Sequence, residues 1–183
     1  MKKKLLMLSA VAICLAIFAA GSLAYFTSQD TAHNVITTGG VEITLQEWAD
    51  EAKTTPFKDL TGVMPNTTVT KIAEIRNTGA SDAWVRVKVE KNIKLQGDGT
   101  PDTGLVELKL NTVDWTEKDG YYYYNKILKP GEITAPIFTA VSFAADMGDE
   151  YQDAAATVDV FAQAVQTANN GDTVLTAQGW PQA

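Results

Sequence analysis

Hydrophobic and polar residues alternate in several short runs along this 183-residue chain. The clearest run lies at residues 84–90, where Val85, Val87 and Val89 alternate with charged residues. A period of two is typical of a β-strand with one buried face. The same reasoning predicts further strands at residues 41–45, 69–76, 106–110, 121–124, 137–143 and from 158 to 164.

Turn motifs separate these runs. Asp119-Gly120 lies between Trp115 and the run Tyr121 to Tyr124, and an Asp-Gly pair in that position is typical of a type I′ hairpin. Pro65-Asn66 predicts a second turn, because proline presets φ and asparagine tolerates a left-handed conformation. Pro130-Gly131 indicates a type II turn. The sequence therefore predicts strands that are connected by short turns.

Helices are expected only as short segments. Residues 46–53 could form one or two helical turns anchored by Trp48, and the acidic connection 144–154 could contain another. About eight short strands with so few helices predict an all-β fold, an antiparallel jelly-roll-like β-sandwich. The alternation leaves the order of the strands open.

The first 24 residues have the pattern of an export signal. Lys2 to Lys4 form a basic start, and the run from Leu5 to Ala20 is almost wholly apolar. Ser22 and Ala24 place small residues three and one positions before Tyr25, as in a secretory cleavage site. We therefore expect a signal helix that is cleaved after Ala24. The alternative is an uncleaved membrane anchor, since the apolar run approaches the roughly 20 residues that cross a bilayer.

This pattern divides the chain into a signal peptide (1–24), a polar N-terminal arm (25–38) and a β-sandwich domain (39–183). After cleavage, 12 basic and 22 acidic residues remain, a net charge of −10. Nucleic acids and anionic membranes attract lysine and arginine, so neither is an expected partner. Membrane contact is expected only through the uncleaved signal. Cys14, the single cysteine, lies in the signal, which excludes disulfides from the mature protein.

The chain lacks a recognisable catalytic set. Zinc hydrolysis needs several histidine or carboxylate ligands, and His33 in the arm is the single histidine. The same histidine would have to serve any Ser-His-Asp triad, and no Gly-x-Ser-x-Gly motif accompanies it. We therefore predict no catalytic residues, no cofactor and no enzyme activity.

An acidic cluster in the connection 144–154 is a weak candidate for a metal site. Hard cations such as calcium bind carboxylates, but the spacing does not match an EF-hand loop. The other interpretation is a solvated acidic loop. The four residues concerned are Asp146, Asp149, Glu150 and Asp153.

The run Tyr121 to Tyr124 places tyrosines on both faces of one strand. One interpretation is a platform on which glycans or cell-wall polymers stack. The other is ordinary packing, with two tyrosines in the core and two covering the outer surface. We favour packing.

Several motifs in fixed order resemble the TasA/camelysin-like family of Gram-positive proteins, which are exported with a SipW-type signal peptidase. The N-terminal part of the resemblance is a small-x-Ala cleavage site, an aromatic-Phe start, a Thr/Ser/Asn-rich arm, a glycine and an alternating strand. It covers residues 22–45. Further similar stretches lie at residues 64–67, 77–79, 83–90, 119–132 and 157–170.

The resemblance implies a jelly-roll domain outside the cell. It also implies that the N-terminal arm can leave its own domain and complete a sheet of the next subunit. The arm residues suited to this role are Tyr25, Phe26, Ala32, Val35 and Ile36. The implied partners are copies of this chain or related matrix subunits, with a SipW-type signal peptidase during export.

The function expected from these observations is a secreted structural subunit of biofilm-matrix or surface fibres. A monomeric cell-surface module that binds glycan, cation or protein is the alternative. A secreted metalloprotease of the camelysin type is a third possibility, although the residues lack the ligands for it.

Overall fold

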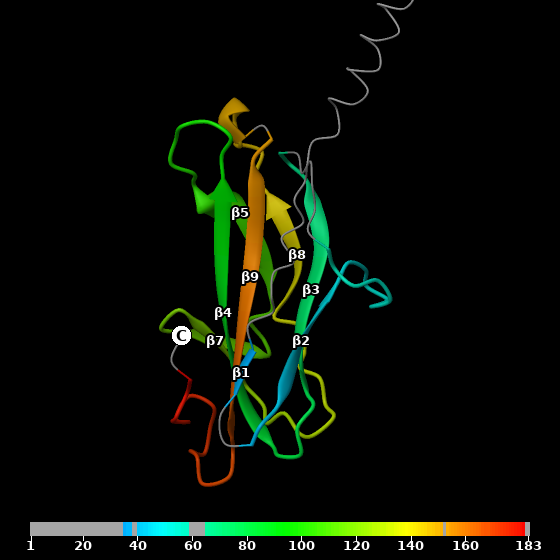
Figure 1. The fold of residues 1–183 in the computed structure, drawn as a ribbon, viewed down its shortest axis with the longest axis vertical. Helices are drawn as coiled ribbons and strands as arrows, with labels where there is room; N and C mark the ends of the chain where they lie inside the picture. The colour runs from blue at the N-terminus through cyan, green and yellow to red at the C-terminus, as the bar shows by residue number, and fades with distance from the viewer. Residues whose placement is uncertain (1–34, 38–39, 59–64, 152, 182–183) are drawn as a thin grey trace, which may run out of the picture.

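The computed structural model describes residues 35–37, 40–58, 65–151 and 153–181. These residues form two β-sheets packed face to face, which confirms the expected all-β sandwich (Figure 1). The five-stranded sheet has the order β1 (Val35–Thr37), β9 (Ala155–Gln166), β4 (Ala83–Lys94), β7 (Tyr121–Tyr124) and β6 (Trp115–Lys118). The four-stranded sheet has the order β2 (Ile43–Trp48), β3 (Thr68–Asn77), β8 (Phe138–Phe143) and β5 (Val106–Leu110).

All strand pairs in both sheets are antiparallel except one, since β1 runs parallel to β9. The predicted signal (1–24) and the arm residues before Val35 lie outside the described residues. Within the described ranges, no helix has both the length and the apolar character needed to cross a membrane.

The core lies between the sheets and follows the alternation of the sequence. Val41, Ile43 and Leu45 are buried, whereas Glu42 and Thr44 between them are exposed. In the opposite sheet, β4 and β9 pair along their full lengths, and several of their inward residues are fully buried. These inward residues include Val85, Val87, Ala162 and Ala164. The strands predicted from period-two runs are therefore confirmed.

The turns also follow the sequence. Asp119 (φ 53°) and Gly120 (φ 78°) both have positive φ, as the type I′ hairpin between β6 and β7 requires. Gly131 (φ 81°) follows Pro130, and the Glu132 N–H donates to the Lys129 carbonyl at 3.0 Å, as in a type II turn. Asn66 has the expected left-handed conformation (φ 57°).

The helical turns expected at residues 46–53 are absent, and that prediction was wrong. Gln46, Glu47 and Trp48 instead extend β2, pairing with Glu74, Ala73 and Ile72 of β3. Strand pairing with a long neighbour outweighs a local helical preference over so few residues. The acidic connection does contain one short 3₁₀ helix, η2 (Asp149–Tyr151), and a second, η1 (Thr103–Leu105), precedes β5.

Candidate functional site

The two lateral sides of the sandwich differ in how their edge strands are protected. On one side lie β6, with four residues, and β5, with five. Both strands carry charges: Glu117 and Lys118 in β6, and Glu107 and Lys109 in β5. Short, charged edge strands discourage pairing with another chain. This side is therefore poorly suited to strand addition.

The edge strands on the opposite side are β1 and β2, and β9 lies next to β1. β4 pairs with all 12 residues of β9, whereas β1 pairs only with Ala162, Gln163 and Ala164. Among the described residues, no strand pairs with Ala155–Phe161 on the side away from β4. We call residues 155–161 the open edge. Its sequence, AATVDVF, contains a single charge, Asp159.

The apolar residues beside the open edge are only partly buried. Ala156 and Val158 of β9 and Val69 of β3 pack against the core with part of their surface exposed. Where β1 covers β9, by contrast, Ala162 and Ala164 have no exposed surface.

β1 lies at one end of the five-stranded sheet. It has three residues, and within the five-stranded sheet it pairs only with β9. Gly40, before β2, has a positive φ of 75° and no atom within 4 Å of a Cβ position. Val35 and Ile36 of the predicted assembly arm lie in β1. Outside the described residues lie the arm residues Tyr25, Phe26 and Ala32, the cleavage residues Ser22 and Ala24, and His33.

Lys71 connects the two sheets at the open edge. It lies on β3 with 5% of its surface exposed, and its amine donates to the Val158 carbonyl of β9 at 3.2 Å. The same amine forms an ion pair with Glu47 of β2 at 2.9 Å and lies 4.4 Å from the centre of the Phe57 ring. One lysine thus contacts β2, β9 and the segment after β2.

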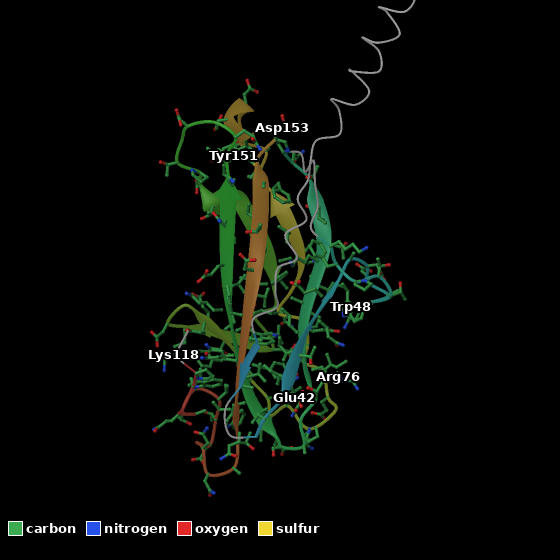
Figure 2. The ribbon with its side chains drawn as sticks, in the orientation of Figure 1. Glu42, Trp48, Arg76, Lys118, Tyr151 and Asp153 are labelled. Carbon is green, nitrogen blue, oxygen red and sulfur yellow. The ribbon has the colours of Figure 1, made fainter. Side chains whose placement is uncertain are left out.

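A second set of polar contacts holds the loop after β2 against β3. Glu74 of β3 has 1% of its surface exposed and accepts hydrogen bonds from Trp48 Nε1 at 3.0 Å and from Lys53 Nζ at 2.5 Å. Figure 2 shows Trp48 beside this loop, at the end of β2. The Phe57 N–H donates to the Glu47 carbonyl at 2.9 Å, which positions the Phe57 ring near Lys71.

Asp50 closes the same loop. Hydrogen bonds from the Thr54 backbone and then from Thr55 lower the pKa of the Asp50 carboxyl below its ordinary value of 3.8, against the opposing effect of burial. A lowered pKa means that the charged form stabilises the folded state above the unfolded pKa, and that this contribution is lost as the pH falls through the folded pKa. We expect an NMR titration of the Asp50 carboxyl carbon to have its midpoint below 3.8. A midpoint at or above 3.8 would contradict these hydrogen bonds.

The acidic connection does not form a metal centre in the described residues. They contain no group of three or more His, Cys, Asp or Glu side chains that could hold a metal ion. The predicted candidates Asp146, Asp149, Glu150 and Asp153 all lie in the described segment between β8 and β9, but geometry gives them no support as ligands. Figure 2 shows Tyr151 and Asp153 at one end of the sandwich.

Hydrogen bonds attach this connection to the 96–104 loop. The Asp102 N–H donates to the Tyr151 hydroxyl at 2.9 Å, and Gln96 Nε2 donates to the Asp153 carbonyl at 3.0 Å. The segment therefore has a structural role at the start of β9.

The four tyrosines of β7 have packing roles. Tyr124 contacts Trp115 in the main core, with ring centres 5.1 Å apart, and Tyr122 packs against the same core. Burial raises the pKa of Tyr122, and the nearby Glu117 carboxylate adds to this effect. These two tyrosines form the inward face of the strand.

The outward tyrosines take part in a stack around Arg86. The guanidinium carbon lies 3.9 Å from the Tyr121 ring centre and 4.7 Å from the Trp180 ring centre, within cation–π range. Arg86 Nη1 also donates to the Tyr123 hydroxyl at 3.2 Å, and Nε donates to Gln163 Oε1 at 2.7 Å. This arginine already occupies the aromatic surface that a glycan platform would offer, which favours the packing interpretation.

Lys71 and its partners were missed from the sequence, although one signal was present. Lys71 falls in the inward series Val69, Ala73 and Ile75 of β3, where an apolar residue is expected. A charge at such a position indicates a buried partner, but the alternation does not reveal that the partners are Glu47 and Val158.

Comparisons with protein-family models, with curated proteins and with solved structures find no match to this chain.

Proposed function

We propose that this protein is a secreted, non-enzymatic structural subunit of biofilm-matrix or cell-surface fibres. The observation that carries the proposal is the arrangement of β1 and β9. The three-residue strand β1 pairs with one end of β9, and none of the other described residues pairs with residues 155–161 on the same side. Long, nearly uncharged sheet edges are the places where another chain adds a strand.

The proposed mode of assembly is exchange of the N-terminal arm between subunits. In such an exchange the β1–β9 pairing within one molecule is replaced by the same pairing between two molecules, which requires no new interface. Continued in the same parallel register, a donor would place residues 28–34 beside residues 155–161 of the acceptor. We propose Gly40, which has a positive φ, as the point at which the arm bends away from its own sheet.

The sequence of the chain supports the same proposal. The pattern at residues 22–45 resembles the TasA/camelysin-like family, whose members are exported through a SipW-type signal peptidase. Strands that follow one another along the chain mostly lie in opposite sheets, as in β3 and β4 or β8 and β9, and this supports a jelly-roll-like organisation. The proposed location is outside the cell, and the proposed partners are other copies or related matrix subunits.

Disulfide trapping between two single-cysteine proteins tests the proposal. The mature chain has no native cysteine, since Cys14 lies in the signal. We expect a mixture of Val35→Cys and Ala162→Cys proteins to form a disulfide-linked heterodimer on oxidation, because these residues are register partners. Non-reducing electrophoresis with mass spectrometry of the linked peptide measures the product.

Two controls define the result. Val113→Cys, at an 85% exposed position outside the strands, should give no heterodimer with Ala162→Cys. A Val35→Cys donor that also lacks residues 25–34 should lose most of the product, because its arm is too short to cover the open edge. If the full-length mixture stays unlinked and monomeric at high concentration, strand exchange is wrong and a monomeric surface module becomes the better proposal.

A further inference from the structure

Residues 167–181, which follow β9, pack on the outer face of the five-stranded sheet; we call them the C-terminal segment. They form a second, smaller core that is separate from the core between the sheets. Its buried members are Trp84, Tyr123, Val165, Val174 and Ala177, with Trp180 packed against them. The C-terminal segment therefore covers Trp84, which alternates with the inward residue Val85 and is only 6% exposed.

A single carboxamide holds the C-terminal segment closed. Asn170 Nδ2 donates to the backbone carbonyls of Gln166 and Gln178, each at 3.0 Å. Asn170 Oδ1 accepts from the Gln178 N–H at 2.7 Å, and the Asn170 backbone carbonyl accepts from Trp84 Nε1 at 3.1 Å. Both N–H groups and the oxygen of the carboxamide are thus in use.

The next residue must be glycine for the segment to close. Gly171 has a positive φ of 71°, and a Cβ at this position would lie 2.8 Å from Thr176 Oγ1 and 2.9 Å from the Ala177 backbone nitrogen. Closure therefore requires the pair Asn170-Gly171. The same pair is open to deamidation, because glycine has no Cβ to hinder attack by its backbone nitrogen on the preceding carboxamide.

Deamidation joins the Gly171 backbone nitrogen to Asn170 Cγ. The Cγ–Nδ2 bond breaks, and ammonia leaves with the proton of the Gly171 N–H. Water then opens the cyclic imide and leaves aspartate or isoaspartate at position 170. In the closed segment both reacting groups are held, the carboxamide by Gln166 and Gln178 and the peptide unit by Trp84. The segment must therefore open before the reaction can proceed.

The product cannot restore the closed arrangement. A carboxylate has no N–H to donate, so the carbonyls of Gln166 and Gln178 lose the donor that Asn170 Nδ2 supplied. A negative oxygen in the place of Nδ2 faces these two carbonyl oxygens and is repelled by them. The loss of two hydrogen bonds and the added repulsion both favour the open segment.

We propose that Asn170-Gly171 is a one-way latch on the C-terminal segment. Opening of the segment exposes the pair to deamidation, and the carboxylate that forms keeps the segment away from the outer face of the sheet. Trp84 then stays exposed. This inference is independent of strand exchange, because the latch involves neither β1 nor residues 155–161.

The first test measures deamidation during incubation of the purified protein in mildly alkaline buffer. Tandem mass spectrometry should show a change from NH₂ to OH that is located at Asn170. In Trp180→Ala the reaction should be about tenfold faster, since loss of the edge-on contact with Tyr123 favours opening by about 1.4 kcal/mol. Equal rates in the two proteins would show that opening is not required, and the latch would be rejected.

Asn125 is the matched internal control. Its Nδ2 also donates to a backbone carbonyl, that of Val113 at 3.2 Å, but Lys126 follows it instead of glycine. Asn125 should keep its mass while Asn170 is converted. If Asn170 is converted no faster than Asn125, the assignment of Asn170 as a deamidation site is wrong.

The second test measures opening through the Trp84 indole N–H. Its exchange with solvent, followed by NMR, should be about tenfold faster in Asn170→Asp and in incubated protein that has been converted at Asn170. The converted protein has already folded, so the test does not depend on folding of the variant. Asn125→Asp should exchange at the original rate, because the Asn125 side chain bonds to Val113 and Thr116, outside the segment. An unchanged rate after conversion of Asn170 would reject the latch.

Discussion

Replacing Glu74 with alanine is expected to lower the free energy of unfolding by about 3 kcal/mol, the effect of breaking a buried charge pair. The Glu74 carboxylate is almost fully buried and accepts from Trp48 Nε1 and Lys53 Nζ. Without the Glu74 carboxylate, the indole N–H of Trp48 loses its acceptor. Lys53 also loses the ion pair that holds the loop after β2 against β3. The same loop carries Phe57, so the cover over Lys71 should loosen as well.

Urea unfolding followed by tryptophan fluorescence measures this change. Glu74→Gln keeps an oxygen that can accept from Trp48, so its loss of stability should be smaller than that of Glu74→Ala. The Asp114–Lys126 ion pair provides a surface comparison, since the Lys126 side chain is 65% exposed and its removal should have little effect. If Glu74→Ala is as stable as the variant that lacks the Lys126 side chain, the buried Glu74 carboxylate does not stabilise the loop after β2.

Replacing Phe138 with alanine is expected to lower the free energy of unfolding by about 3–5 kcal/mol. Phe138 has no exposed surface and lies in β8 between Ala73 of β3 and Leu110 of β5. Removal of the ring leaves a cavity in the middle of the four-stranded sheet, which the neighbouring strands can close only in part.

Thermal and urea unfolding of Phe138→Ala and Val113→Ala provide the comparison. Val113 is an apolar residue with 85% of its surface exposed, so its truncation should change stability little. Both residues are hydrophobic, but Phe138 is the larger and is fully buried, whereas Val113 is smaller and exposed. Equal stabilities of the two variants would contradict the packing described for β8.

The strands and turns could be predicted because the signals for them are local. Val85 and Val87 show by their spacing that one face of β4 is buried, and Asp119-Gly120 identifies a hairpin by its φ requirements alone. The end of β2 was misjudged because Gln46 to Trp48 are strand residues only through pairing with β3, more than 20 positions away. Sheet order depends on such distant contacts throughout the fold.

The candidate site was predictable only in part for the same reason. Val35 and Ile36 lie in the predicted arm, and the structure places them in β1. The Lys71 bond to Val158 spans 87 positions, and the Arg86 stack brings Tyr121 and Trp180 together from separate strands and loops. A periodic pattern identifies which face a residue occupies, but not which distant residue it meets there.

In the strand exchange that we propose, each subunit would donate β1 to one neighbour and accept β1 of the other neighbour beside β9. Subunits joined through that pairing would all point the same way, so a filament would have two unlike tips. One tip would present an unused donor segment, and the other an uncovered acceptor strand. Growth at the two tips would then proceed at different speeds, and a molecule that blocks one kind of tip would stop elongation there only.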